Sequence, residues 1–226
     1  MRMYAHKGYV IGGILVVFIL TLLSLSDTYQ WRMPGPLNTG HEKLQCNECH
    51  ELAKHGFRAQ IQANIDYLFG KRTSLVSFNF ESPGNKDCLS CHEREDDNHP
   101  VYRFNEPRFS DARKAIVPQY CTSCHKEHSG VRVSSDIDYC QHCHEDIEVK
   151  NDPLDISHAD LVVLKDWHTC LACHDFHGNH IMKVATKIKY MKAQKLIKNY
   201  FAGGKDPYSE KKYEQSQETR YDNKPN

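Results

Sequence analysis

Residues 121–144 read CTSCHKEHSGVRVSSDIDYCQHCH. This stretch contains the pattern Cys-x-x-Cys-His twice, beginning at Cys121 and at Cys140. The same pattern occurs three more times in the chain, beginning at Cys46, Cys88 and Cys170. All 10 cysteines of the 226 residues therefore lie in such pairs, and each pair is followed at once by a histidine.

This pattern is the attachment motif of haem c. Two thiols about one helical turn apart add to the two vinyl groups of one porphyrin, and the adjacent histidine supplies a nitrogen to the iron. Structural zinc needs two Cys-x-x-Cys pairs per ion and gives no reason for a histidine after each pair. Disulfides within such pairs would staple almost no chain. The sequence therefore predicts five covalently attached haem c groups. The predicted cofactor-binding residues are Cys46, Cys49, His50, Cys88, Cys91, His92, Cys121, Cys124, His125, Cys140, Cys143, His144, Cys170, Cys173 and His174.

The overall composition excludes some functions and constrains the core. Lys plus Arg and Asp plus Glu both total 29, so the formal net charge is zero, and no nucleic-acid partner is expected. Mean hydropathy is −0.67 and charged residues make up 26 % of the chain. Five haems within residues 27–180 leave roughly 30 residues for each haem. We therefore expect a mostly α, irregular fold, in which a compact domain over 27–180 has the haems as its core.

The N-terminal part contains the one long apolar run. From Gly8 to Ser26 there are 19 uncharged residues, which as a helix would extend about 28 Å, close to the thickness of a bilayer core. Arg2 and Lys7 precede the run and Asp27 follows it. The excess of positive charge on the N-terminal side predicts that the N-terminus stays in the cytoplasm.

These features predict a transmembrane anchor over residues 1–26, in the bacterial inner (cytoplasmic) membrane. The domain over 27–180 would then lie in the periplasm, where haem c is attached. The alternative is a cleaved signal peptide with a cleavage site at residues 24–26, although the run exceeds the usual 7–15 apolar residues of such peptides.

The longest stretch without an attachment motif runs from residue 56 to residue 87. Apolar residues at helical spacing predict a helix over Ala59 to Phe69. The segment from Thr73 to Phe80 is β-prone, and a turn is expected at 83–85. The stretch is interpreted either as a cover over the first two haems or as a docking or quinol-proximal surface.

The C-terminal part is basic. Residues 181–204 contain six lysines and no acidic residue, and they predict a basic amphipathic helix that ends at Gly203-Gly204. Residues 181–226 carry a net charge of +6, whereas 27–180 carry −8. Three roles fit the helix: binding to anionic lipid, binding to an acidic partner, or offsetting the haem propionates. Residues 205–226 are expected to form a polar tail that is extended or disordered.

The second axial ligands decide whether the chain is an enzyme. If every iron takes two imidazoles, all are closed to substrate, whereas an open iron would allow catalysis. The motifs use five of the 15 histidines, and His6 lies in the N-terminal segment. Histidines three residues after a motif histidine point away from their own haem. The histidines expected as distal metal ligands are His41, His99, His128, His158 and His177. The reserves are His55, His168 and His180, and the least favoured is His142, which lies inside a motif.

The chain from His41 to His180 resembles the class III multihaem cytochromes c. The resemblance rests on the short motif spacing, the Cys-x-x-Cys-His-x-x-His variants at 121–128 and 170–177, and the upstream His41. With the apolar run added, the whole looks like a membrane-anchored pentahaem c-type cytochrome.

This resemblance implies an electron carrier and not an enzyme. The carrier would relay electrons between a membrane redox complex, such as a quinol dehydrogenase, and a periplasmic electron donor or acceptor. It would be held at the lipid bilayer as a subunit of a larger respiratory complex. The alternative function is a periplasmic reductase with one open haem, acting on a small nitrogen or sulfur oxyanion.

Overall fold

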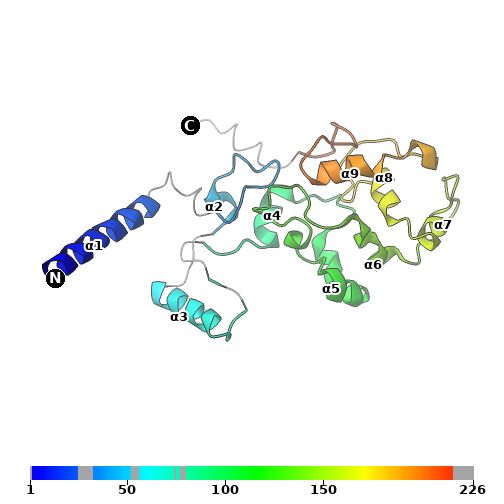
Figure 1. Ribbon diagram of the computed structural model, residues 1–226. Coiled ribbons are helices and arrows are strands. Elements are labelled where there is room, and N and C mark those ends of the chain that lie inside the picture. Colours follow the sequence, from blue (N-terminus) through cyan, green and yellow to red (C-terminus); the bar gives the residue numbers. More distant parts are fainter. Residues whose placement is uncertain (1, 25–32, 52–55, 74, 77–79, 216–226) are drawn as a thin grey trace.

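The computed structural model describes all residues except 1, 25–32, 52–55, 74, 77–79 and 216–226 (Figure 1). The α-helices are α1 (Arg2–Ser24), α2 (Cys46–Cys49), α3 (Phe57–Leu68), α4 (Asn85–His92), α5 (Ser110–Ile116), α6 (Gln141–His144), α7 (His158–Val163), α8 (Cys170–Cys173) and α9 (Gln194–Phe201). The 3-10 helices are η2 (Val101–Asn105), η3 (Pro107–Phe109), η4 (Cys121–Ser123), η5 (Ile137–Cys140), η6 (Trp167–Thr169) and η7 (Ile188–Tyr190). Most of these elements are short and are joined by irregular segments. The prediction of a mostly helical, irregular fold is confirmed.

The predicted transmembrane anchor is wrong. Within the described part of the chain, no helix is both long enough and apolar enough to cross a bilayer. The predicted location, a single-pass protein of the inner membrane with its bulk in the periplasm, is corrected together with the anchor.

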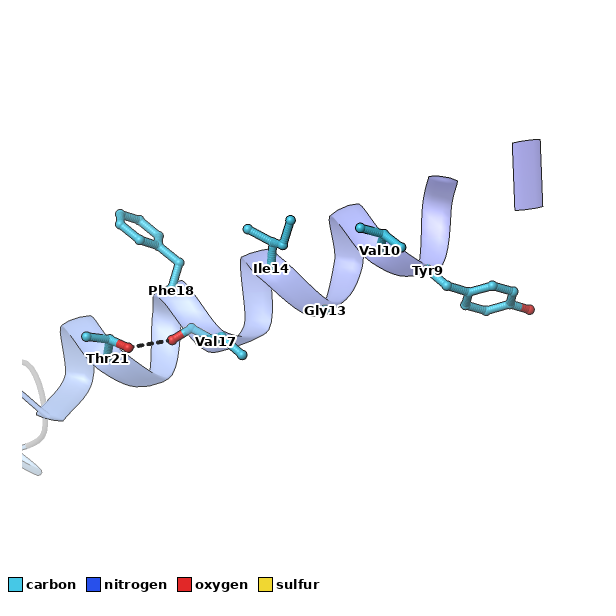
Figure 2. Close-up of a pocket in the computed structure, with 7 residues that line it drawn as sticks. All are labelled: Tyr9, Val10, Gly13, Ile14, Val17, Phe18 and Thr21. Atoms are coloured by element: carbon cyan, nitrogen blue, oxygen red, sulfur yellow. Dashed lines mark hydrogen bonds between the residues drawn. The ribbon is translucent and has the colours of Figure 1, made fainter. Parts of the chain in front are cut away.

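Helix α1 extends away from the other helices (Figure 1). Its apolar side chains are exposed, and Tyr9, Ile14 and Phe18 project from it into solvent (Figure 2). The Thr21 hydroxyl donates a hydrogen bond of 2.8 Å to the Val17 carbonyl within the same helix (Figure 2). Helix α1 contributes none of the paired histidines described below.

Helix α3 confirms the helix predicted over Ala59 to Phe69, with a start two residues earlier. The Asn64 side chain fastens α3 to the following loop, because its Nδ2 donates to the Val76 carbonyl at 2.9 Å and its Oδ1 accepts from the Val76 N–H at 2.7 Å. Much of the predicted β-prone segment, residues 74 and 77–79, lies outside the described residues.

The aliphatic core is small and lies around α8 and α9. Ile197 of α9 is fully buried and packs against Leu171 of α8, with Phe201 and Tyr208 beside them. Leu171 is one of the two residues between the cysteines of the fifth motif. The main hydrophobic cluster therefore packs directly against an attachment motif.

The basic segment is less helical than predicted. Residues 181–187 are not helical because their backbone bonds to other segments: the Ile181 N–H donates to the Lys211 carbonyl at 2.9 Å, and the Thr186 carbonyl accepts from the Asp155 N–H at 3.2 Å. Helix formation is limited to η7 and to α9. The predicted end of the helix is confirmed at Gly203, which has a φ of 97° and follows the C-cap Ala202.

The first half of the predicted polar tail packs against the fifth motif. An isolated antiparallel bridge pairs His180 with Lys212. The Tyr208 hydroxyl donates to the Leu171 carbonyl at 2.8 Å, and the Tyr213 N–H donates to the Asn179 carbonyl at 2.9 Å. Residues 205–215 are therefore fixed on the domain by backbone and side-chain contacts, and the rest of the tail lies outside the described residues.

Candidate haem-binding sites

Each attachment motif folds into a short helical turn. In three motifs the N–H of the motif histidine donates to the carbonyl of the first cysteine: His50 to Cys46 at 2.9 Å, His125 to Cys121 at 2.9 Å, and His174 to Cys170 at 2.7 Å. Such a turn brings the two thiols close together and places the histidine at its end. We number the sites 1 to 5 in the order of the motifs along the chain.

Every motif histidine faces a histidine from outside its motif. The distances between ring centres, from site 1 to site 5, are 6.2 Å for His50–His128, 5.8 Å for His92–His41, 6.2 Å for His125–His177, 6.1 Å for His144–His99 and 6.2 Å for His174–His158. In sites 1 to 4 the two rings come from segments far apart in the sequence. The histidine pairs therefore bring together segments of the chain that are distant in the sequence.

These distances fit two imidazoles on one iron. A metal–imidazole bond is about 2 Å long and the ring nitrogen lies about 1.1 Å from the ring centre, so two rings on opposite sides of one iron have centres roughly 6 Å apart. Within the described residues, no group of three or more His, Cys, Asp or Glu side chains has the geometry to hold a metal ion by itself. The histidines meet in pairs, as axial ligands of a porphyrin iron do.

Among the described contacts, hydrogen bonds at Nδ1 orient seven of the paired rings. Four of these rings bond to backbone carbonyls: His50 to Glu81 at 2.7 Å, His99 to Phe176 at 2.5 Å, His125 to Arg132 at 2.8 Å and His128 to Gly35 at 3.2 Å. A carbonyl can only accept, so it holds the proton on Nδ1 and leaves the Nε2 lone pair for a metal.

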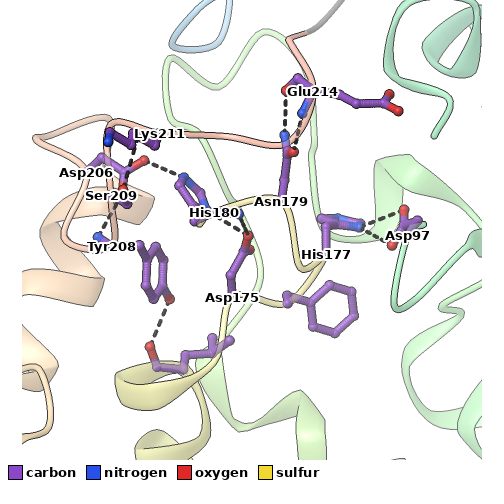
Figure 3. Close-up of polar contacts among 12 residues, drawn as sticks. Asp97, Asp175, His177, Asn179, His180, Asp206, Tyr208, Ser209, Lys211 and Glu214 are labelled. Atoms are coloured by element: carbon purple, nitrogen blue, oxygen red, sulfur yellow. Dashed lines mark hydrogen bonds and ion pairs between the residues drawn. The ribbon is translucent and has the colours of Figure 1, made fainter. Parts of the chain in front are cut away.

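Each histidine that lies opposite a motif histidine is called a facing histidine. Three facing histidines bond through Nδ1 to carboxylates instead of carbonyls. The distances are 2.7 Å for His41–Glu127, 2.8 Å for His158–Asp152 and 3.1 Å for His177–Asp97, the last shown in Figure 3. A carboxylate at Nδ1 makes the imidazole a more basic ligand. Sites 2, 3 and 5 therefore each contain a negatively charged partner behind one ring.

The carboxylates are stabilised in their charged form. Burial would raise the pKa of Glu127 and of Asp97, but the hydrogen bonds and charges of His41 and His177 outweigh it, and both pKa values lie below the ordinary range. The pKa of Asp152 is lowered to about 2, chiefly by the backbone N–H of His158, which donates to it at 2.6 Å.

The buried side-chain amide of Asn38 connects the segments that carry two of the facing histidines, His41 and His128. Asn38 is 3 % exposed; its Nδ2 donates to the Lys126 carbonyl at 3.1 Å, and its Oδ1 accepts from the Ser129 N–H at 3.2 Å. The Asn38 N–H also donates to Glu127 at 3.4 Å. These contacts join the segment that carries His41 to the segment that carries His128.

Sequence reasoning did not identify these orienting residues. Glu127 is adjacent to His128 and Asp97 is two residues before His99, so their nearness to candidate ligands was visible in the sequence. However, each orients a histidine from a different segment, and that pairing is known only from the tertiary structure.

Thiols from different motifs lie side by side at two places. Cys88 of site 2 hydrogen-bonds to Cys121 of site 3, which raises the pKa of Cys88 and lowers that of Cys121. Cys140 of site 4 hydrogen-bonds to Cys170 of site 5, with the same opposite effects on their pKa values. Site 2 is therefore next to site 3, and site 4 is next to site 5.

The remaining neighbours complete a row of sites. Burial raises the pKa of Cys49 in site 1 to about 11, and the nearby Cys88 of site 2 contributes to the rise. Between sites 3 and 4, the Asn98 N–H donates to the His177 carbonyl at 3.2 Å, and His99 bonds to the adjacent Phe176. The contacts place the five sites in the order 1, 2, 3, 4, 5.

The other histidines have different surroundings. His180 bonds through Nδ1 to Asp175 at 2.7 Å and through Nε2 to Asp206 at 2.6 Å (Figure 3). Burial alone would lower the pKa of His180, but the two carboxylates outweigh it and raise the pKa. Both ring nitrogens are used, so His180 fixes the C-terminal segment. His142 meets the ring of Tyr139 at 6.4 Å. His168 is half-buried, and His55 lies outside the described residues.

The comparisons with known proteins agree with this reading of the motifs. Residues 73–145 match the family Cytochrome c3, and the matched segment contains the attachment motifs of sites 2, 3 and 4. No curated protein and no solved structure matches the chain. The family match implies covalently bound haem c, and it supports a multihaem c-type cytochrome that functions in electron transfer.

Proposed function

We propose that this chain is a five-haem electron carrier. The two cysteines and the histidine of each motif would hold one haem c, and the facing histidine would supply the second axial ligand. The five ring-centre distances of 5.8–6.2 Å carry this proposal. Each bound haem would supply one-electron chemistry at its iron.

The facing histidines favour a carrier over a reductase. A reductase needs one motif histidine whose opposite side is open to substrate. All five motif histidines have a facing imidazole at a distance that suits coordination. The chain would therefore hold its irons closed on both sides and exchange electrons only.

The order of the sites supports a relay. Successive sites adjoin at Cys49 and Cys88, at Cys88 and Cys121, at Asn98 and His177, and at Cys140 and Cys170. Sites 1 and 5 are the two ends of this row. Redox proteins that donate or accept electrons are the partners of such a relay.

The first test is spectroscopic. Haem is quantified by pyridine haemochrome, and the oxidised protein is examined by EPR and optical spectroscopy with and without cyanide. Five haems per chain, all low-spin and indifferent to cyanide, are the expected result. A high-spin haem that binds cyanide would instead support the reductase.

A second test concerns the carboxylate behind His41. Replacing Glu127→Gln removes the charge that makes His41 a basic ligand, so the ferric state at site 2 is less stabilised. We expect the midpoint potential of one haem to rise by tens of millivolts, on the order seen for changes around axial ligands. A spectroelectrochemical titration measures the shift.

The matched control is Glu93→Gln. Glu93 is exposed and adjacent to His92, so the control removes an equal charge near the same site. Its potentials are expected to stay close to those of the wild type. Equal shifts in the two variants would show that charge alone matters and that the hydrogen bond to His41 does not.

A further inference from the structure

We propose that a basic strip beside site 5 is the docking surface for an acidic, one-electron redox protein. The strip is formed by Lys183, Lys187, Lys189, Lys192, Lys195 and Lys198. This inference rests on the proposed function, and it names the site and the class of partner for electron exchange.

The strip presents positive charge at the surface of the protein chain. Five of its lysines are exposed and Lys192 is half-buried. Among the described residues, none of the six forms an ion pair. A nearby carboxylate, Asp155, accepts the Ile188 N–H at 2.9 Å. Because residues 27–180 are net negative, the charge asymmetry would orient an acidic partner toward the strip.

The strip is fastened to the fifth attachment motif. The Lys192 N–H donates to the carbonyl of Ala172, which lies between the two cysteines of the motif, at 3.2 Å. Helix α9 lies beside α8 (Figure 1), and Ile197 packs on Leu171. A protein bound to the strip would therefore lie next to site 5, at one end of the row.

Apolar side chains lie between the lysines. Val184, Tyr190 and Leu196 are 42 %, 66 % and 50 % exposed. The Lys189 ammonium lies 5.0 Å from the centre of the Tyr190 ring. Exposed apolar groups that alternate with charged residues are suited to a protein interface, because charge steers the encounter and apolar contact stabilises it.

The same contacts disfavour a lipid surface. A helix that lies on a bilayer needs its apolar face free. In α9 that face is used inside the molecule, because Ile197 is fully buried and Phe201 packs with it against the hydrophobic cluster.

The exchange with a docked protein involves one electron: the reduced centre of the partner is oxidised and one ferric site is reduced, with no bond formed or broken.

The test uses a reduced plant-type [2Fe–2S] ferredoxin as an acidic probe, whose potential of about −400 mV allows it to act as a donor. The strip variant carries Lys187→Glu, Lys189→Glu and Lys195→Glu. The control variant makes the same charge change at Lys43, Lys71 and Lys150, which are exposed elsewhere. Stopped-flow mixing at low ionic strength gives the second-order rate constant of reduction.

We expect the strip variant to react roughly tenfold more slowly or worse than the control, since steering by a charged patch changes association rates by 10- to 1,000-fold. Added salt should slow the wild type and leave the strip variant nearly unchanged. Equal slowing of both variants, or no slowing of either, would overturn the docking surface.

A second measurement uses the wild type and does not depend on the folding of a variant. Carbodiimide joins carboxylates to amines in contact, and peptide mapping should place the links to ferredoxin on the strip lysines. Links at other lysines would contradict the proposal.

Vesicles containing phosphatidylglycerol test whether the strip binds an anionic lipid surface instead. If the strip variant loses vesicle binding but keeps its rate with ferredoxin, the strip binds lipid and the docking proposal is wrong.

The two proposals fail separately. Dithionite is a small reductant that does not need the strip, so it should reduce both variants fully. If the wild type is low-spin at all five haems but both variants react alike with ferredoxin, only the docking surface is wrong. A cyanide-binding haem in the wild type would contradict the carrier function whatever the ferredoxin kinetics.

Discussion

Replacing His177→Ala is expected to turn one of the five haems into a high-spin, cyanide-binding haem. The His177 ring centre lies 6.2 Å from that of His125, and its Nδ1 bonds to Asp97 at 3.1 Å (Figure 3). Alanine removes the facing imidazole and keeps the backbone carbonyl, which accepts from Arg94 at 2.6 Å. The local chain path is therefore retained while site 3 loses one axial ligand.

EPR of the oxidised variant measures the effect directly. About one fifth of the iron should move from the low-spin to the high-spin signal, and cyanide should bind to that fraction only. Added imidazole should restore the low-spin spectrum, because it replaces the missing ring. A merely structural role of His177 would not be rescued in this way.

The matched control is His168→Ala. His168 is half-buried and lies near the fifth motif, and in the described part of the chain each motif histidine is faced by another histidine instead. Its variant should keep all five haems low-spin. If His177→Ala also leaves every haem low-spin, the assignment of His177 to site 3 is wrong.

The motifs were readable from the sequence because their chemistry is local. A thiol pair followed by histidine needs only five consecutive residues, as in residues 121–125. Candidate partners such as His128 were also visible, since a ring three residues beyond a motif histidine cannot reach the same iron. Which motif histidine each partner faces was not readable. His128 faces His50, 78 positions away in the sequence, because Asn38 and Gly35 hold its loop against the N-terminal segment.

The errors arose where tertiary contacts override a local pattern. The basic segment has helical spacing, but the backbone of Ile181 pairs with Lys211, so the chain there is extended. The polar composition of the tail favours disorder, but Tyr208 and Asp206 contact Leu171 and His180 and fix it. The carboxylates that orient the rings were missed for the same reason, since Glu127 bonds to His41 across 86 residues.

The second large effect is expected on stability. Ile197→Ala should lower the free energy of unfolding by about 2–5 kcal/mol, the range for removing a buried aliphatic side chain and leaving a cavity. Ile197 is 0 % exposed and packs against Leu171, with Phe201 and Tyr208 beside it. Guanidinium titration followed by far-UV circular dichroism and by the Soret band measures the loss.

The adjacent residue provides the control. Leu196 lies in the same helix and is 50 % exposed, so Leu196→Ala removes a side chain that is half in solvent already. Its cost should stay below about 1 kcal/mol, because little apolar area is lost and alanine favours the helix. The difference between the two variants therefore isolates burial from helix propensity.

The comparison decides what holds the C-terminal part of the chain on site 5. Leu171 lies inside the fifth motif and also receives the Tyr208 hydroxyl on its carbonyl. If the aliphatic cluster fastens α9 to the motif, Ile197→Ala should shift the circular dichroism and Soret transitions together to lower denaturant. If the Soret transition stays in place while the helical signal is lost earlier, haem attachment holds site 5 by itself and α9 is an independent cover. An Ile197 variant as stable as the Leu196 variant would contradict the packing of α9 on α8.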